Sequence, residues 1–235
     1  RSSLRKVQTV LYPVAGAKML MFKRLLRKSF LFDIVKTMNT EEQQLLDNLK
    51  VAVTERSADE NFVHHKWFVK YHLEIVEKIA LELCEKYPEA NKFKVLTLAW
   101  LHDYEKIIDF DNQYNTELQA TIELMQQHGF EAMFIEQMAA DLNTYNTKEN
   151  LSTAPIEIQI VSSSDAASHS VGPFMCLYWY ENPDFSVEQL MEANIRKISV
   201  DWEKKITLPE VKDAFSKFRD FNLQVAGRLP EKYLK

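Results

Sequence analysis

The chain has 235 residues, of which 46% are hydrophobic and 11% aromatic, and its net charge is −5. This length and composition fit a single domain with a substantial buried core. Only four glycines occur, which argues against all-β folds, with their many turns, and against glycine-rich phosphate loops. The sequence therefore predicts an all-α fold of about eight to ten helices around one core.

The N-terminal segment is strongly basic. Residues 1–32 hold eight Lys or Arg and no acidic residue. Such a segment is typical of an organelle transit peptide, of an amphipathic helix on a membrane surface, or of an upstream extension of a fragment, and all three interpretations stay open. We expect residues 1–38 to form an extension and residues 39–235 to form the helical domain.

Composition also limits the compartment and the partners. Cys84 and Cys176 show neither zinc-site spacing nor a disulfide framework, which favours a reducing compartment. No apolar run reaches the roughly 18–20 residues that span a bilayer. We expect a soluble intracellular protein, cytoplasmic or imported into an organelle, with homo-oligomerisation left open. The acidic body has no basic stripe, so nucleic acid is not expected as a partner.

Hydrophobic periodicity and capping residues define the expected helices. They fall at about 40–56, 65–87, 91–102, 116–130, 131–145, 155–170, 174–180, from 186 onward, and 209–225. Thr40 is the expected cap of the first helix, with Gln43 at the capping-box position. Ile156, Ile158 and Ile160 alternate as in a strand, but the wider spacing of apolar residues favours a helix there.

The stretch "LAWLHDYEK", residues 98–106, places His102 and Asp103 together at the end of an apolar run. Burying either group requires a hydrogen bond, a counter-charge or a metal ion. His72 lies on the apolar face of the helix at 65–87, and Asp165 lies in a helix of small residues. Two imidazoles and two carboxylates without a thiolate suit a hard or borderline divalent ion, whose charge the carboxylates balance.

His72, the pair His102-Asp103, and Asp165 resemble the H…HD…D pattern of the HD-domain phosphohydrolase superfamily. The segments "HLEIVEKIA" and "LAWLHDYEK" are similar to those that carry the family's first ligands, and the resemblance covers about residues 60–225. It implies an HD-domain-like helical bundle in which these four residues hold one divalent ion, Mn, Mg, Fe, Co or Ni. Family members with two ions have further histidines before the last Asp, which the matching segments of this chain lack.

The resemblance implies hydrolysis of a phosphate ester of a small metabolite or nucleotide. Asp103 would serve the reaction as a ligand, and Lys106, which resembles the lysine of an HDxxK motif, would neutralise the phosphate. Glu105 is a candidate general base. His65, two helical turns before His72, is expected to reach the substrate. The alternative is a catalytically inactive binding or regulatory protein in which the metal ion only staples the fold.

Two further features have competing interpretations. His169, one turn after Asp165, could be a fifth ligand or a partner of a ligand, but a surface histidine is the favoured interpretation. The aromatic cluster of Phe174, Tyr178, Trp179 and Tyr180 is expected to belong to the core.

Overall fold

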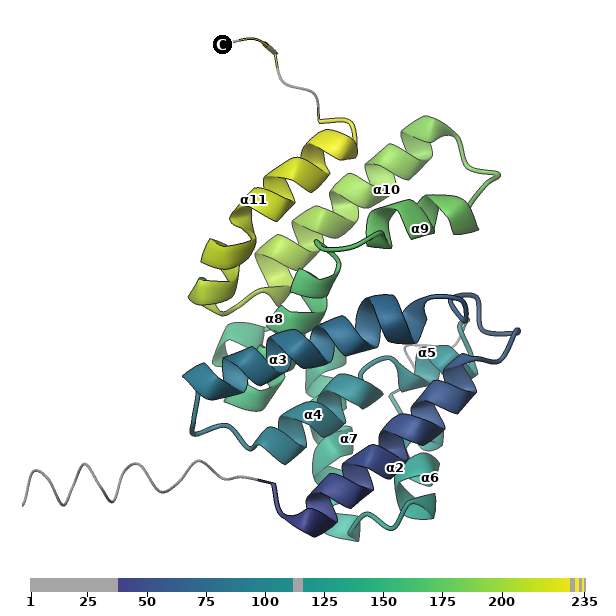
Figure 1. Ribbon diagram of the computed structural model, residues 1–235, viewed down its shortest axis with the longest axis vertical. Helices are drawn as coiled ribbons and strands as arrows, with labels where there is room; N and C mark the ends of the chain where they lie inside the picture. The colour runs from purple at the N-terminus through teal and green to yellow at the C-terminus, as the bar shows by residue number, and fades with distance from the viewer. Residues whose placement is uncertain (1–37, 112–115, 229–230, 233, 235) are drawn as a thin grey trace, which may run out of the picture. The chain divides into compact units, whose positions relative to one another are not determined.

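A computed structural model describes residues 38–111, 116–228, 231–232 and 234. Every regular element among these residues is a helix, which confirms the all-α fold class (Figure 1). The predicted basic extension lies, except for Met38, outside the described residues. Within the described part of the chain, no helix is both long and apolar enough to cross a membrane.

Apart from α5, which was not predicted, the helices follow the order that the periodicity predicted, with short π-helical and 3₁₀ segments (η) between them. They are α2 (Thr40–Ser57), η1 (Val69–Leu73), α3 (Glu74–Lys86), α4 (Lys92–Leu101), α5 (Tyr104–Ile108), α6 (Gln119–Gln127), α7 (Ala132–Thr147), η2 (Leu151–Thr153), α8 (Ile156–Ser168), α9 (Phe174–Glu181), α10 (Val187–Val200), η3 (Asp201–Lys205) and α11 (Pro209–Val225). The ambiguous segment at 155–170 is therefore helical.

Two helix starts differ from the sequence-based expectation. The capping box of α2 is formed by Asn39 and Glu42, one residue before the predicted pair Thr40 and Gln43. Asn39 has extended backbone geometry, so its side chain can accept the hydrogen bond from the backbone of Glu42 at 2.9 Å. The helix expected from residue 65 begins later, because residues 63–67 form turns before η1 and α3.

Helices α3, α4 and α8, which contain or directly adjoin the predicted ligands, occupy the centre of the core. Helix α3 packs against α4 and α8, and α4 also packs against α2 and α7. All residues of α4 from Phe93 to Leu101 are buried, as expected of a central element. Residues 162–168 of α8 are buried as well, and their small side chains allow α8 to approach α3 closely.

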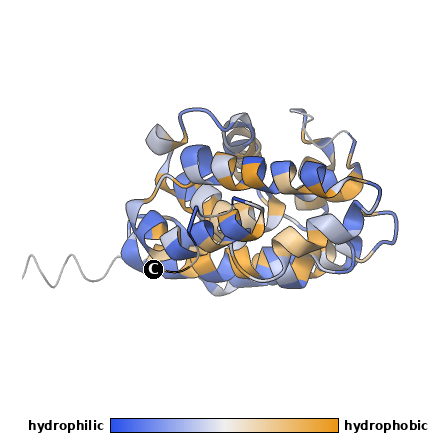
Figure 2. Ribbon diagram, turned by 90° about the horizontal axis from the view of Figure 1, so that it is seen from above, coloured by the Kyte–Doolittle hydropathy of each residue, from blue (hydrophilic) through white to orange (hydrophobic). Residues whose placement is uncertain are grey.

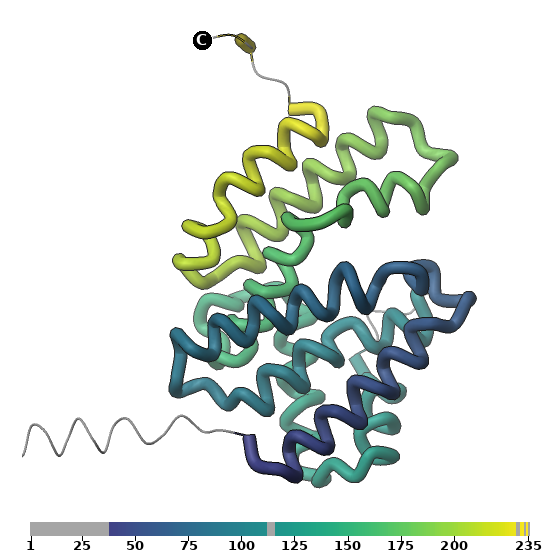
Figure 3. Tube along the Cα trace, viewed as in Figure 1, coloured from purple at the N-terminus to yellow at the C-terminus, as the bar shows by residue number. Residues whose placement is uncertain are grey.

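Helices α9, α10 and α11 lie on the opposite side of α3 from α2 and α4 (Figures 1 and 3). They pack on one another, and a small cluster of Met175, Ile198 and Ala226 adds to the main core. Polar and apolar residues share most helices, as expected of elements with one solvated face (Figure 2). Tyr180 is 65% exposed, so the prediction that the aromatic cluster of α9 is buried core is wrong for this residue.

Candidate metal centre

The four residues predicted as ligands come from three central elements. His72 lies in η1, Asp165 lies in α8, and His102 and Asp103 follow the last residue of α4. Asp103 leaves helical geometry, with φ −118° and ψ 15°. Because the helix breaks at this point, the adjacent side chains of His102 and Asp103 can face the same point instead of diverging around a helix.

The donor atoms of these residues lie close together in five of the six possible pairs. His72 Nε2 lies 3.2 Å from His102 Nε2, 3.6 Å from Asp165 Oδ1 and 3.8 Å from Asp103 Oδ2. His102 Nε2 lies 3.6 Å from Asp165 Oδ1 and 3.7 Å from Asp103 Oδ2. Neighbouring ligands at about 2.1 Å from an ion are roughly 3.0–3.4 Å apart. A small contraction would therefore place the four side chains around one ion.

Hydrogen bonds leave the Nε2 atoms of His72 and His102 available as ligands. The hydroxyl of Ser168 donates to the carbonyl of Asp165 at 2.7 Å and lies 3.0 Å from His72 Nδ1, from which it can accept. His102 Nδ1 donates to the carbonyl of Ala99 at 2.8 Å. A neutral imidazole with a proton on Nδ1 has its lone pair on Nε2, which is the state that a metal ligand needs.

The electrostatic environment of the centre favours a cation. Burial would raise the pKa of Asp103, but Lys106 and His102 hold it below its ordinary value. Burial would lower the pKa of His102, but Asp103 and Asp165 raise it. The negative charge of the carboxylates therefore favours a proton on His102, and the same charge would attract a metal ion.

The second oxygen of Asp165 has its own partners. Lys205, from η3, contacts Oδ2 with its ammonium group, and the hydroxyl of Tyr145 donates to the same oxygen at 2.5 Å. Despite burial, Lys205 and then His169 hold the pKa of Asp165 well below its ordinary value. The sequence did not reveal Lys205, because "DWEKK" resembles a solvated charged segment and its partner lies 40 residues away.

His169 is buried beside the predicted ligands, so the favoured interpretation as a surface histidine is wrong. Its Nε2 lies 3.3 Å from Asp165 Oδ1, and its Nδ1 lies 2.9 Å from Asp201 Oδ2. The spacing of four residues from Asp165 on a buried helix was the sequence signal for this placement.

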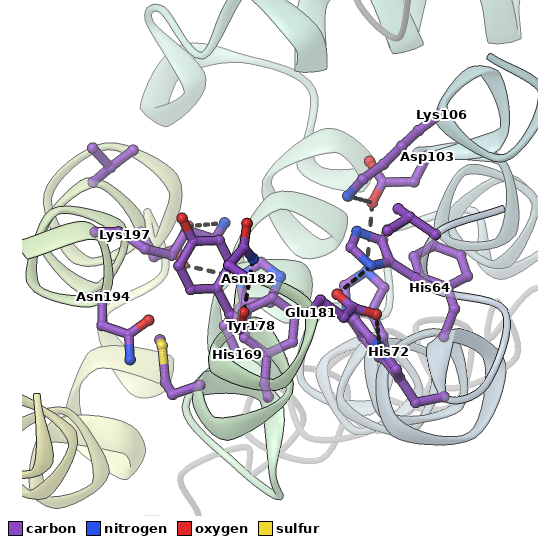
Figure 4. A pocket seen from close by; sticks show the side chains of 18 of the residues that line it. His64, His72, Asp103, Lys106, His169, Tyr178, Glu181, Asn182, Asn194 and Lys197 are labelled. Carbon is purple, nitrogen blue, oxygen red and sulfur yellow. Dashed lines mark hydrogen bonds and ion pairs between the residues drawn. The ribbon is translucent and has the colours of Figure 1, made fainter. Parts of the chain in front are cut away.

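A cavity of about 640 Å³ opens onto the centre. His72, Asp103 and His169 line it together with Lys106, and helices α9 and α10 contribute the facing side chains, among them Lys197 (Figure 4). The side chain of Asp103 is 26% exposed, which gives the predicted ligand an open side. The centre is therefore accessible to a small molecule.

Two residues predicted to take part in the reaction lie elsewhere. Glu105 Oε1 accepts hydrogen bonds from the backbone and the hydroxyl of Thr121, each at 2.8 Å, so it stabilises the first turn of α6 and does not line the cavity. His65 Nδ1 bonds to the carbonyl of Phe62, and His64 lines the cavity instead. The α-helical register assumed for His65 fails because this segment forms turns and η1 is π-helical.

His64 belongs to a polar cluster that the sequence did not indicate. Its Nδ1 lies 2.8 Å from Glu181 Oε2, while the indole of Trp67 donates to Glu181 Oε1 at 2.6 Å. Burial, with a contribution from Lys106, lowers the pKa of His64 to about 3. A neutral histidine and a carboxylate that accepts two hydrogen bonds therefore line the same cavity as His72 and Asp103.

In comparisons with known proteins, no family model matched the chain, and neither a curated sequence nor a solved structure gave a significant match. The interpretation of the centre rests on its chemistry. His72, His102 and Asp103 form one group of donors that could hold a metal ion, and His72, Asp165 and His169 form another. Both groups share His72, and they consist of nitrogen and oxygen donors alone.

Proposed function

We propose that this protein is a metal-dependent phosphohydrolase of HD-domain type that hydrolyses a phosphate ester of a small metabolite or nucleotide. The proposal rests on one observation: beside an open cavity, the Nε2 atoms of His72 and His102 lie 3.2 Å apart, and each lies 3.6–3.8 Å from a carboxylate oxygen of Asp103 and of Asp165. A divalent ion held there, Mn, Mg, Fe, Co or Ni, would lower the pKa of a coordinated water and polarise a phosphoryl oxygen.

Basic side chains around the cavity support an anionic substrate. Lys106, Lys148 and Lys197 line it. Burial lowers the pKa of Lys148, and the neighbouring ammonium groups of Lys205 and Lys197 lower it further. Several ammonium groups therefore lie near one another at this part of the cavity, and a phosphate group would reduce the repulsion among them. Lys106 would oppose the charge that develops on the phosphoryl oxygens.

The remaining walls support a leaving group with an apolar or planar part. Their aromatic members come from the turn before η1, from the segment after α5 and from α9: Trp67, Phe68, Phe110, Phe174 and Tyr178. Asn182 and Asn194 add polar groups. A cavity of about 640 Å³ falls within the range of small-molecule sites. The proposed substrate is therefore a compact phosphate ester.

Two observations favour the alternative of a catalytically inactive, metal-stapled binding protein. The carboxylate of Glu105, which was the predicted general base, accepts two hydrogen bonds from Thr121. Lys106 Nζ also lies 3.3 Å from Asp103 Oδ2, so the lysine has a partner within the centre itself. In this alternative the cavity would bind a phosphorylated ligand without cleaving it.

Metal loading combined with a substrate screen separates the two functions. Metal-free protein is reloaded with each ion in turn and assayed for hydrolysis of phosphomonoesters, nucleotides and cyclic nucleotides. Phosphate release is measured for the first two classes, and conversion to the nucleoside monophosphate is measured for cyclic nucleotides. The proposed enzyme hydrolyses at least one of these compounds, and Asp103→Asn abolishes the hydrolysis while Asp47→Asn, on the exposed face of α2, leaves it unchanged. A protein that binds one ion but hydrolyses none of these compounds would support the binding function instead.

A further inference from the structure

A buried imidazole outside the H…HD…D pattern faces the predicted ligands. His169 Nε2 lies 3.3 Å from Asp165 Oδ1, the oxygen that also lies 3.6 Å from the Nε2 atoms of His72 and His102. The donor atoms of His72, Asp165 and His169 all lie within 4.8 Å of one another. The rings of His72 and His169 are almost parallel, at 6°. Three Nε2 atoms therefore surround one carboxylate oxygen.

The partner of His169 Nδ1 determines which nitrogen of this ring carries the proton. Asp201 Oδ2 lies 2.9 Å from Nδ1, and Asp201 is itself buried and bonded through Oδ1 to Lys197 at 3.1 Å. An ionised carboxylate only accepts hydrogen bonds, so Nδ1 must donate and the lone pair of the neutral ring lies on Nε2. A histidine held by a carboxylate on its other nitrogen is the usual arrangement of a metal ligand.

Without a cation, the facing donor atoms repel one another. Three imidazole Nε2 atoms and an ionised carboxylate oxygen meet in a buried setting, and a proton on His102 alone cannot bridge all of them, so acceptors are left without a donor. One positive ion among them satisfies all four donors at once. We infer that His169 is a fifth protein ligand of the divalent ion, oriented by Asp201, so that three histidines and two aspartates form the centre. This inference rests on the metal centre of the proposed function.

A five-ligand centre has a consequence for the choice of ion. Three imidazole nitrogens suit Mn²⁺, Fe²⁺, Co²⁺ and Ni²⁺, whereas Mg²⁺ prefers oxygen ligands and keeps several waters. An octahedral ion with five protein donors has one position left for a water or substrate oxygen. The inference therefore predicts that the centre prefers Mn²⁺, Fe²⁺, Co²⁺ or Ni²⁺ to Mg²⁺.

The test measures metal binding and does not depend on activity. Metal-free wild-type protein, His169→Ala, His169→Gln and Asp201→Asn are titrated with Co²⁺ by calorimetry, and the visible spectrum of the bound ion, which depends on its coordination, is recorded. His128→Ala, at the end of α6 and outside the cluster, is the control. Mg²⁺ and Mn²⁺ titrations of the wild-type protein test the ion preference. Circular dichroism of each metal-free variant shows whether it is folded.

We expect His169→Ala to weaken Co²⁺ binding by about 100-fold or more, and Asp201→Asn to weaken it by about 10–100-fold. The spectrum of His169→Ala should change, and added imidazole, which fits the vacated space, should restore it. His128→Ala should bind as the wild type does. If His169→Ala fails to fold, the Co²⁺ affinity and spectrum of His169→Gln and Asp201→Asn test the inference in its place.

Wild-type affinity and spectrum in the folded His169 variants would overturn the inference while leaving the four-ligand centre and the proposed function intact. Wild-type binding of Mg²⁺ as tight as that of Mn²⁺ would also count against three imidazole ligands. Conversely, if metal binding required His169 but the protein hydrolysed no phosphate ester, the result would support the inference and contradict the proposed function.

Discussion

The buried ammonium of Lys205 contacts Oδ2 of Asp165 and leaves Oδ1 of the same carboxylate to face the three histidines. Tyr145 donates to Oδ2 as well. Oδ2 therefore interacts with Lys205 and Tyr145, while Oδ1 faces the histidines of the candidate metal centre. As a ligand of the proposed ion, Asp165 would therefore offer a single oxygen, and the charge balance of the centre depends on a residue of η3.

Replacing Lys205 by Met should destabilise the metal-free protein by about 3 kcal/mol, because it leaves the charge of Asp165 buried without a partner. A divalent ion should restore part of this loss, since it supplies a positive charge on the other oxygen. Urea unfolding with and without Mn²⁺ measures both effects.

Lys197→Met is the matched control for the Lys205 variant. Lys197 also pairs with a buried aspartate, Asp201, but its side chain is 38% exposed, so its loss should cost less than about 1 kcal/mol. Equal destabilisation by the two variants would show that the buried pair between Lys205 and Asp165 stabilises the fold no more than the partly exposed pair between Lys197 and Asp201.

Asp103→Ala should lower metal affinity by more than about 100-fold and yet change the unfolding free energy of the metal-free protein by less than about 1 kcal/mol. The reason is that Asp103 is partly open to the cavity, and its removal also relieves repulsion with Asp165. Calorimetric titration and thermal unfolding in chelator measure the two quantities. Asp47→Ala is the exposed control, and unchanged affinity in Asp103→Ala would remove this residue from the set of ligands.

The affinity for the metal ion should rise with pH above about 6.5. Burial lowers the pKa of His102, but Asp103 and Asp165 outweigh it, so the pKa lies above the ordinary value of 6.5. In that range His102 still holds a proton that the ion must displace, so affinity should increase by up to about tenfold per pH unit until the pKa is passed. Above that point the affinity should level off.

Calorimetry in two buffers of different ionisation enthalpy counts the protons released on metal binding. We expect up to about one proton per ion near neutral pH. Affinity that does not change between about pH 6 and 8, with no proton released, would show that His102 is already neutral in the metal-free protein.

The sequence predicted most of the helices because they are encoded locally, and it predicted the four candidate ligands because their residue types and spacing resemble a known motif. Helical periodicity, the cap of α10 at Ser186 and the break after α4 depend on residues close together in the chain. Lys205 and Asp201 could not be predicted, because their partners lie 40 and 32 residues away and only the packing of η3 against α8 brings them together. The hydrogen bonds of Glu105 to Thr121 could not be predicted either, because Thr121 lies 16 residues away.

Lys106→Ala tests whether this lysine acts on the substrate or only on the fold. Lys106 Nζ lies 3.3 Å from Asp103 Oδ2 and lines the cavity, so the ammonium can face a phosphoryl oxygen next to the ligands. If it stabilises charge that develops during hydrolysis, its loss should lower kcat by about 10²-fold, which corresponds to about 2.7 kcal/mol.

Metal content and thermal stability of Lys106→Ala should stay close to wild type, because the pair between Lys106 and Asp103 is partly exposed and a bound ion would neutralise Asp103 in its place. Lys66→Ala is the matched control, since Lys66 is an exposed lysine that does not line the cavity. Steady-state kinetics with the best substrate of the screen, together with metal analysis, separates the two roles. Full activity in Lys106→Ala would make its pairing with Asp103 purely structural, whereas a fall in activity that follows a loss of bound metal would assign Lys106 to holding the ligand in place.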